Sequence, residues 1–270
     1  MDPKIFNQLK TLIYDASGIT LTEQKETLVS TRLAKRLRVL KMETHEEYLA
    51  FLDNGRNSEE LVSLLDVIST NVTSFFREVE HFDFTEKVMT EWLAEGQNRF
   101  RFWSAASSSG EEPYSLAMKL CEIFGGKNVD AKILATDIST KVLALCMEGV
   151  YPKERLATVP KPMLDKYFTR IANPEGGEES YKVRPILQNM IAFRRINLST
   201  PPFSIHGPID IVFCRNVMIY FDKDVRTRLL SEIYRVLRPG GYLFVGHSES
   251  LTSLKTEFTP VRPAIYYKKV

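Results

Sequence analysis

The chain has 270 residues, of which 44% are hydrophobic and 26% are charged, and its formal net charge is only +2. This length can form one large domain or a small domain plus a medium one, and any basic surface must be local. No apolar run is long enough to span a membrane, and Met1–Lys4 does not begin a signal peptide, so we expect a cytoplasmic protein.

The cysteines and histidines do not follow the spacing of a disulfide framework or a metal site. Three cysteines lie inside apolar runs, which favours buried thiols in a reducing compartment. The four histidines are scattered along the chain without the spacing of metal ligands. These residues are Cys121, Cys146, Cys214, His45, His81, His206 and His247. We therefore expect no bound metal.

The first part of the chain, from residue 4 to about residue 90, is predicted to be helical. Apolar residues recur at helical spacing from Ile5 to Ile13, and Ser17-Gly18 ends this helix. Further helices are predicted over 22–42 and 59–69.

Helix 22–42 carries an apolar stripe and a basic face. The basic face consists of Arg32, Lys35, Arg36 and Arg38. No acid lies between Glu26 and Glu43. A charged helix face is usually only solvated, yet solvated faces mostly mix both signs. An acidic partner, either protein or nucleic acid, is therefore the alternative hypothesis.

The segment 70–78, TNVTSFFRE, separates the helical part from the remainder. It can be a helix cap followed by two core phenylalanines. Because of its position, it can also be a linker that folds over a ligand site.

From Phe100 onward, strands and helices alternate, which predicts a mainly parallel sheet. A strand over 100–105 and a helix over 114–124 are joined by small residues and the acidic pair Glu111-Glu112. A strand, a tight turn and a helix in this order begin an α/β nucleotide-type site. The carboxylates would repel a pyrophosphate and favour a ligand with hydroxyls, an amine or a positive charge.

The second strand, 131–136, ends at Asp137. Its distance from the first turn fits the acid that holds ribose hydroxyls in doubly wound folds. The helix 139–147 follows at once, so Asp137 can equally be a plain N-cap.

Residues 160–198 interrupt the alternation. Short strands are predicted at 166–172, 181–185 and 190–196, with a turn at Asn173–Gly177, and they indicate a small antiparallel insert.

The main sheet is then resumed by a buried strand, 209–214, which delivers Arg215-Asn216 to the edge where open α/β folds bind ligands. A helix over 224–237 and strands over 242–246 and 265–269 complete the sheet.

Two other motifs are excluded. The phosphate-binding and dinucleotide fingerprints are absent, because the first turn has a single glycine. Gly246–Ser250 resembles a nucleophile elbow, but it lacks the final glycine and no histidine follows Ser248.

Taken together, the motifs resemble the chemotaxis receptor methyltransferases of the CheR family. The matching segments run in order along nearly the whole chain: 70–78, 102–115 (FWSAASSSGEEPYS), 135–139 (ATDIS), 196–198 (INL), 213–222 (FCRNVMIYFD) and 237–250 (LRPGGYLFVGHSES). Ser107 and Ser109 depart from residues common in relatives, but each replaces one small residue by another.

The resemblance implies a class I S-adenosylmethionine-dependent methyltransferase fold. This is a Rossmann-like, mainly parallel sheet with an all-α N-terminal domain and a small antiparallel β insert. The expected divisions are a helical domain over 1–78, a linker helix over 79–90, and a cofactor-binding domain over 91–270 that contains the insert 160–196.

The resemblance also implies an enzyme that methylates glutamate side chains of chemoreceptors, with S-adenosylmethionine as cofactor and S-adenosylhomocysteine as product. The residues implied to bind the cofactor are Asn71, Thr73, Arg77, Glu112, Asp137, Asn197, Leu198, Arg215 and Asn216. Glu111 is the alternative to Glu112. Arg77 and Tyr220 are expected beside the transferred methyl group and are the catalytic candidates.

Partners follow from the same resemblance. The basic helix, through Arg32, Lys35, Arg36 and Arg38, would dock on the helical signalling domain of a receptor. The β insert would hold a peptide at the receptor C-terminus. We expect a monomer without nucleic acid or membrane insertion.

The chemistry agrees with this set of residues. A glutamate side chain has an ordinary pKa of about 4.3, so at neutral pH it attacks a sulfonium methyl group without a general base. Arg77 can orient that carboxylate by two-point hydrogen bonding. The alternatives are a nucleic-acid methyltransferase that uses the basic helix, and a non-catalytic module that binds S-adenosylmethionine.

Overall fold

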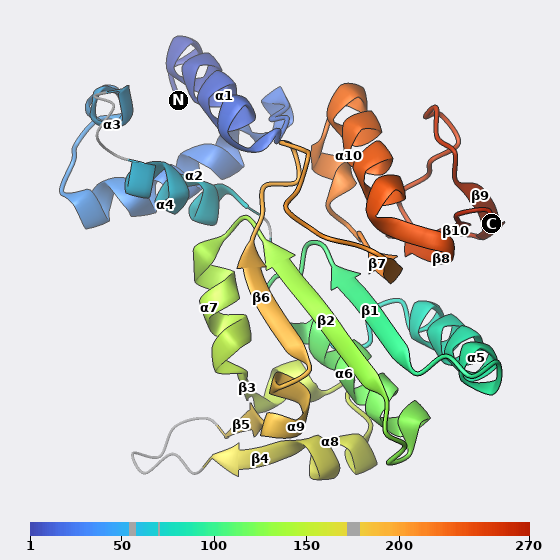
Figure 1. Ribbon diagram of the computed structural model, residues 1–270. Coiled ribbons are helices and arrows are strands. Elements are labelled where there is room, and N and C mark those ends of the chain that lie inside the picture. The colour runs from blue at the N-terminus through green and yellow to red at the C-terminus, as the bar shows by residue number, and fades with distance from the viewer. Residues whose placement is uncertain (54–57, 70, 172–178) are drawn as a thin grey trace.

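A computed structural model describes residues 1–53, 58–69, 71–171 and 179–270 (Figure 1). The N-terminal part is helical and buries its own apolar cluster, which includes Leu9, Leu33 and Leu64. Its elements are α1 Pro3–Ser17, a 3₁₀ turn Glu23–Lys25, α2 Glu26–Leu40, α3 His45–Asp53 and α4 Ser58–Ile68. No bounds were predicted for α3.

Local chemistry sets the limits of α1. The Asp2 side chain accepts a hydrogen bond from the Lys4 amide (2.7 Å) and caps the first turn. Pro3 suits this turn because proline has no amide hydrogen that would be left without an acceptor. Gly18 ends the helix with φ +70°, a conformation that favours glycine.

In the described ranges, the main sheet has seven strands in the order β6-β2-β1-β7-β8-β10-β9. Its strands are β1 Arg99–Ser104, β2 Asp130–Asp137, β6 Ile191–Arg195, β7 Ile209–Phe213, β8 Leu237–Phe244, β9 Thr259–Arg262 and β10 Ile265–Tyr267. The first five strands in that order pair in parallel, whereas β10 pairs antiparallel with β8 and with β9.

Helices cover both faces of this sheet. Phe102 and Phe213 face α5 Glu80–Ala94 and α6 Glu111–Phe124, and Trp103 and Val212 face α10 Lys223–Val236. Neighbouring strand residues point to opposite faces, so continuously apolar strands are buried on both sides. The remaining helix beside the sheet, α7 Thr140–Glu148, lies next to β6 (Figure 1).

The structure contains the predicted antiparallel insert, but the strands that form its sheet are not all the predicted ones. Its sheet has the order β3-β5-β4, formed by Val150–Pro152, Ser180–Val183 and Phe168–Ile171. The predicted third strand, 190–196, instead forms β6 and pairs in parallel with β2 at the edge of the main sheet. A short apolar run does not reveal its partner, which is why the sequence placed it wrongly.

Other limits of the insert also differ from the prediction. Residues Lys161–Tyr167 form α8, and the strand predicted from 166 begins at Phe168. The remaining short elements are the 3₁₀ turn Lys153–Leu156 and α9 Pro185–Gln188 in this region, and the 3₁₀ turn Met218–Tyr220 after β7. Ala172 and the predicted turn at Asn173–Gly177 lie outside the described residues.

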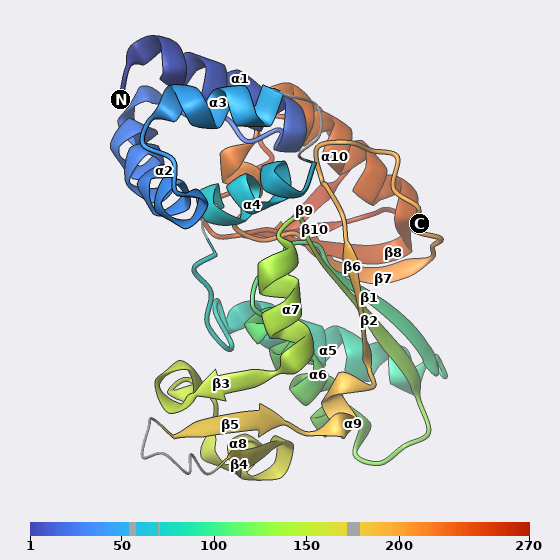
Figure 2. The same cartoon turned by 90° about the vertical axis from the view of Figure 1, so that its left-hand side faces the viewer.

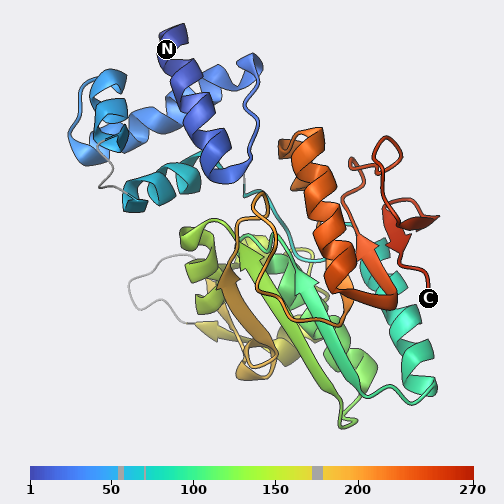
Figure 3. The same cartoon turned by 45° about the horizontal axis from the view of Figure 1, so that its top comes forward.

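The N-terminal helices lie over the carboxyl ends of the parallel strands (Figures 2 and 3). The Thr20 amide donates to the carbonyl of Tyr220 (2.8 Å), and Asn197 Nδ2 donates to the carbonyl of Ala16 (2.9 Å). These bonds place the helices above the edge of the sheet where a ligand site is expected.

Candidate functional site

A cleft with about 1160 Å³ of space, partly open to solvent, lies between the N-terminal helices and the carboxyl ends of β1, β2 and β7. Every residue predicted to bind the cofactor or to take part in catalysis lines it. These residues are Asn71, Thr73, Arg77, Glu112, Asp137, Asn197, Leu198, Arg215, Asn216 and Tyr220. The structure therefore brings together the segments whose motifs were recognised separately.

The two glutamates after β1 face different parts of the molecule. The helix α6 begins at Glu111, three residues earlier than predicted, so both side chains lie in its first turn. Glu112 lines the cleft, where its oxygens accept from Ser104 Oγ (2.7 Å) and Arg215 Nη1 (2.9 Å). Glu111 is directed to the insert and pairs with Arg155 Nη1 (2.6 Å). Of the two alternatives, Glu112 is the cleft residue.

Glu112 is held as a buried carboxyl group. Burial raises its pKa, and the Arg215 guanidinium and the Ser104 hydroxyl oppose that shift. Glu112 thus offers a carboxyl group to the cleft, which fits a cationic or amine-bearing ligand better than a phosphate.

Asp137 ends β2 and does not cap the following helix. The N-cap of α7 is Ser139, whose Oγ accepts from the Val142 amide (3.2 Å). The plain N-cap interpretation of Asp137 is therefore wrong. The Asp137 oxygens accept from the amides of Ser108 (2.9 Å) and Ser139 (3.0 Å), which leaves further lone pairs for ligand hydroxyls. Burial raises the pKa of Asp137.

The segment 71–79 is neither helix nor strand and lines one side of the cleft. Both interpretations of its sequence hold in part. Phe75 is a core residue whose ring meets Tyr151 of the insert at 5.0 Å between centroids. Arg77 reaches the cleft and donates to the carbonyl of Val72 (3.0 Å). Thr70 of the predicted motif lies outside the described residues.

Two glutamates that the sequence analysis did not single out support the cleft. Glu78 Oε2 accepts from Arg215 Nη2 (3.0 Å), and Glu249 Oε2 accepts from the Asn216 amide (2.8 Å). Burial would raise the pKa of Glu78, but Arg215 outweighs it and the pKa lies below its ordinary value. Both glutamates lie inside the recognised segments, next to Arg77 and Ser248. This position in the motifs was the feature of the sequence from which their role could have been predicted.

Close packing explains one glycine of this region. A Cβ at Gly246 would lie 2.3 Å from the Asn216 side-chain nitrogen. Asn216 itself has φ +57°, an uncommon conformation for a residue with a side chain. The conformation of the chain at Asn216 therefore depends on close packing against Gly246.

The basic face of α2 is not continuous in the folded protein. Arg32 lines the cleft and donates to the carbonyls of Ile68 (2.6 Å) and Ser69 (3.1 Å). Arg36 pairs with buried Glu60 of α4 (Nε to Oε1, 2.7 Å). Lys35 and Arg38 are exposed. The expectation of an uncompensated basic face is wrong for Arg36, because the compensating acid comes from another helix.

The N-terminal helices add one further cation to the cleft. Lys25, just before α2, places its Nζ 4.8 Å from the centre of the Tyr220 ring. The sequence analysis did not select Lys25, since only the domain contact brings it to Tyr220.

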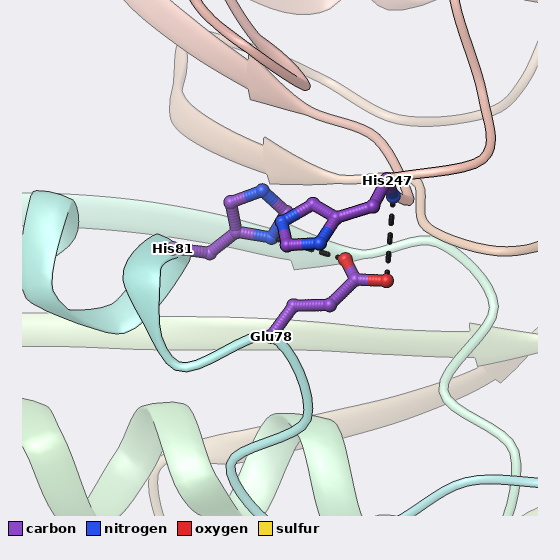
Figure 4. A group of neighbouring side chains, drawn as sticks. All are labelled: Glu78, His81 and His247. Atoms are coloured by element: carbon purple, nitrogen blue, oxygen red, sulfur yellow. Dashed lines mark hydrogen bonds and ion pairs between the residues drawn. The ribbon is translucent and has the colours of Figure 1, made fainter.

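The structure also joins two of the scattered histidines. His81 and His247 lie with ring centres 5.3 Å apart, beside the Glu78 carboxylate (Figure 4). Burial, reinforced by Arg215, lowers the pKa of His81 to about 3.

Comparisons with known proteins give the same assignment along nearly the whole chain. Residues 71–266 match the family model described as CheR methyltransferase, SAM binding domain, and residues 4–69 match CheR methyltransferase, all-alpha domain. The chain is 40% identical over 261 residues to chemotaxis protein methyltransferase 2 of Pseudomonas aeruginosa, covering 97% of this chain and 91% of that protein. It is 38% identical to the chemotaxis protein methyltransferase of Salmonella typhimurium, with 97% and 88% coverage.

Proposed function

Because this chain belongs to the CheR methyltransferase family, we propose that it transfers the methyl group of S-adenosylmethionine to glutamate side chains of chemoreceptors. One observation carries the proposal: the residues that the family resemblance implies, from Asn71 to Tyr220, line a single cleft. The relatives named above are chemotaxis methyltransferases, so neither a nucleic-acid substrate nor a non-catalytic role is favoured.

The residues of the cleft fit S-adenosylmethionine by their chemistry. Two buried carboxyl groups, Glu112 and Asp137, suit an amine or sulfonium charge and a pair of ribose hydroxyls. Asn71 and Thr73 would cover the cofactor, and the remaining predicted residues would frame its adenine and methionine ends. These are Asn197, Leu198, Arg215 and Asn216. When bound, the cofactor supplies an electrophilic methyl group on a positively charged sulfur.

The transfer needs alignment rather than acid–base catalysis. An ionised glutamate oxygen forms a bond to the methyl carbon, and the electron pair of the broken carbon–sulfur bond stays on sulfur. No proton moves, so no general base is required. Arg77 would orient the carboxylate, and Tyr220 would hydrogen-bond either that carboxylate or the methionine end. Positioning of this kind contributes roughly 7–11 kcal/mol in favourable cases.

We further propose a division of labour between the parts of the chain. The helical domain, residues 1–78, would dock on the receptor through exposed Lys35 and Arg38 and contribute Arg32 to the cleft. Residues 79–90, most of which lie in α5, would link it to the cofactor-binding domain, 91–270. The insert would hold a peptide from the receptor C-terminus, and the enzyme would act as a monomer in the cytoplasm.

The direct test is transfer of labelled methyl from S-adenosylmethionine to a purified cytoplasmic fragment of a chemoreceptor. We expect base-labile label that disappears when the receptor glutamates are replaced by alanine. Label that survives base and the Glu→Ala substitutions would exclude glutamate esterification. Tight cofactor binding without transfer would instead support the non-catalytic role.

A further inference from the structure

We propose that Glu78, His81 and His247 form a binding site for a divalent transition-metal ion, for which Zn²⁺ is the probe. Their possible ligand atoms lie within 4.8 Å of one another. Figure 4 shows the two imidazole rings and the carboxylate directed toward a common space, from two segments of the chain that are far apart in sequence. Glu78 precedes α5, His81 lies in its first turns, and His247 follows β8.

His81 is the observation that points to a ligand. It is 1% exposed, and neither ring nitrogen has a hydrogen-bond partner among the residues that the structure describes. Its Nδ1 lies 3.5 Å from Glu78 Oε2. Buried polar groups are nearly always satisfied in native proteins, so two unsatisfied nitrogens on one side chain require an explanation. A metal ion bound through Nδ1 provides a partner for that nitrogen.

The surroundings of His81 hold its ring in place. The ring stacks on Phe244, with centres 5.3 Å apart and an angle of 12° between the planes. A fixed imidazole loses little conformational freedom when it binds an ion. His81 is thus the preformed ligand of the site.

Glu78 and His247 supply the other donors and the entry path. The Glu78 carboxylate is positioned by the amide of His247 (3.3 Å) and by Asn216 Nδ2 (3.4 Å). His247 is exposed, so an ion can enter from solvent beside it. Tetrahedral ligands about 2.1 Å from Zn²⁺ are roughly 3.4 Å apart, and rotation of the exposed His247 ring can close the present spacing.

The charge of the cluster also permits a cation. Arg215 shares Glu78 Oε2 and opposes metal binding there, but Glu112 holds the same guanidinium from its other side (2.9 Å). Arg215 therefore keeps a carboxylate partner when Glu78 turns to a metal. Two imidazoles and one carboxylate form a donor set that suits Zn²⁺ and other first-row transition ions, with positions left for water.

Occupation of this site would join the segment 71–79 to the chain after β8. Both lie beside Arg215 and Asn216, which line the cleft. None of the three ligands is itself among the residues proposed to hold S-adenosylmethionine, and the site does not depend on the proposed methylation.

The test is titration of the full-length, tag-free protein with ZnCl₂, followed by calorimetry. The informative variants are His247→Ala, which changes an exposed side chain, and His81→Phe, which keeps an aromatic ring against Phe244. His206→Ala is the matched control, because His206 is an exposed histidine outside the cluster. We expect one site per chain in the parent and in the control, with Kd raised at least tenfold in both cluster variants.

Bound Co²⁺ gives an independent measurement, since its visible absorption reports the coordination of the ion. The parent and His206→Ala should show a spectrum that is lost in His247→Ala. The proposal is overturned if the parent protein binds no metal at millimolar concentration. It is equally overturned if all variants bind alike, or if His206→Ala causes the loss.

Discussion

Glu112 is buried against Arg215 and Ser104, whereas its neighbour Glu111 is turned toward Arg155 of the insert. Adjacent residues of a helix point about 100° apart, so one carboxylate faces the cleft and the other the insert. Separate substitution of the two glutamates therefore distinguishes a role in ligand binding from a role in structural support.

Glu112→Gln should weaken binding of S-adenosylhomocysteine at least tenfold, because the amide keeps the size of the side chain but removes its negative charge. Glu111→Gln should leave that affinity within about threefold and lower the melting temperature instead, since Arg155 loses its charged partner. Calorimetric titration and thermal unfolding of both variants measure the two effects. Equal losses of affinity would contradict the assignment.

Arg77 is half-buried at the cleft and bonded to the carbonyl of Val72. Arg77→Ala should lower kcat by a factor of about 100 or more, while the melting temperature changes little, because the orienting group is lost from a partly exposed position. Arg77→Lys should recover only part of the rate, since an ammonium cannot make the planar two-point contact. A wild-type rate in Arg77→Ala would exclude an orienting role.

His81 links pH to stability. Its pKa falls from 6.5 to about 3 on folding, because burial and the nearby Arg215 disfavour the charged ring. Below pH 6.5 this histidine binds a proton in the unfolded chain but stays neutral in the folded protein. Its contribution to the free energy of unfolding is therefore fully present above pH 6.5 and is lost progressively toward pH 3. Between pH 7.5 and pH 5.5 this amounts to about 1.4 kcal/mol in the free energy of unfolding.

Urea unfolding at these two pH values, without added metal, measures the effect. His81→Phe should lose about 1.4 kcal/mol less than the parent over the same interval. An identical pH dependence in both proteins would show that another group is responsible.

At the scale of single elements, α2 combines structural and exposed cations on one helix. Arg36 satisfies buried Glu60, which also accepts from the Tyr48 hydroxyl (2.6 Å). Lys35 and Arg38 point to solvent. The cations of this helix therefore have two roles, to neutralise a buried carboxylate and to form an exposed basic surface, and sequence spacing does not distinguish these roles.

Substitutions on α2 distinguish the docking role of the exposed cations from the structural role of Arg36. Lys35→Glu with Arg38→Glu should raise the KM for a receptor fragment about tenfold, with unchanged affinity for S-adenosylhomocysteine and unchanged stability. Arg36→Ala should lower the free energy of unfolding by on the order of 3 kcal/mol, because it leaves Glu60 buried without its cation. Receptor kinetics and urea unfolding provide the measurements. An unchanged KM in the double variant would remove α2 from the docking surface.

The insert is connected to the turn after β1 and to the segment 71–79. Tyr151 donates to the carbonyl of Ser109 (2.7 Å), and Thr158 donates to the carbonyl of Phe75 (2.8 Å). Contacts of this kind place the insert behind the cleft as structural support. This role is additional to the proposed peptide binding.

At the scale of the whole molecule, the fold is that expected of class I methyltransferases, with an all-α N-terminal domain and a three-stranded antiparallel sheet. No helix within the described ranges is long and apolar enough to cross a membrane. Both parts of the chain line the cleft, since Lys25 and Arg32 of the N-terminal part and Asp137 and Tyr220 of the following part all belong to its lining.

A ligand in the cleft should therefore protect both parts at once. We expect S-adenosylhomocysteine to slow amide hydrogen exchange in residues 71–77 and 25–32, as well as in 105–108. Helix α3 serves as the internal control, because its residues are not among those described as lining the cleft. Protection confined to residues 105–216 would show that the N-terminal helices take no part in ligand binding.

The sequence by itself determined the family, the alternation of strands and helices, and ten of the residues that line the cleft. These follow from local signals: Pro and Gly limit helices, apolar runs mark buried strands, and motifs such as FCRNVMIYFD are specific. It also indicated an antiparallel insert, but not which strands form it.

Only the tertiary structure decided the contacts between distant segments. The strand at 191–195 could pair in either sheet, Arg36 could be free or paired, and His81 and His247 could be unrelated or adjacent. Each outcome depends on which residues are brought together from far along the chain. A local pattern carries no information about such partners, and so it predicted most of the elements and the main residues of the cleft, but not the partner strand of β6, the Arg36–Glu60 pair or the histidine cluster.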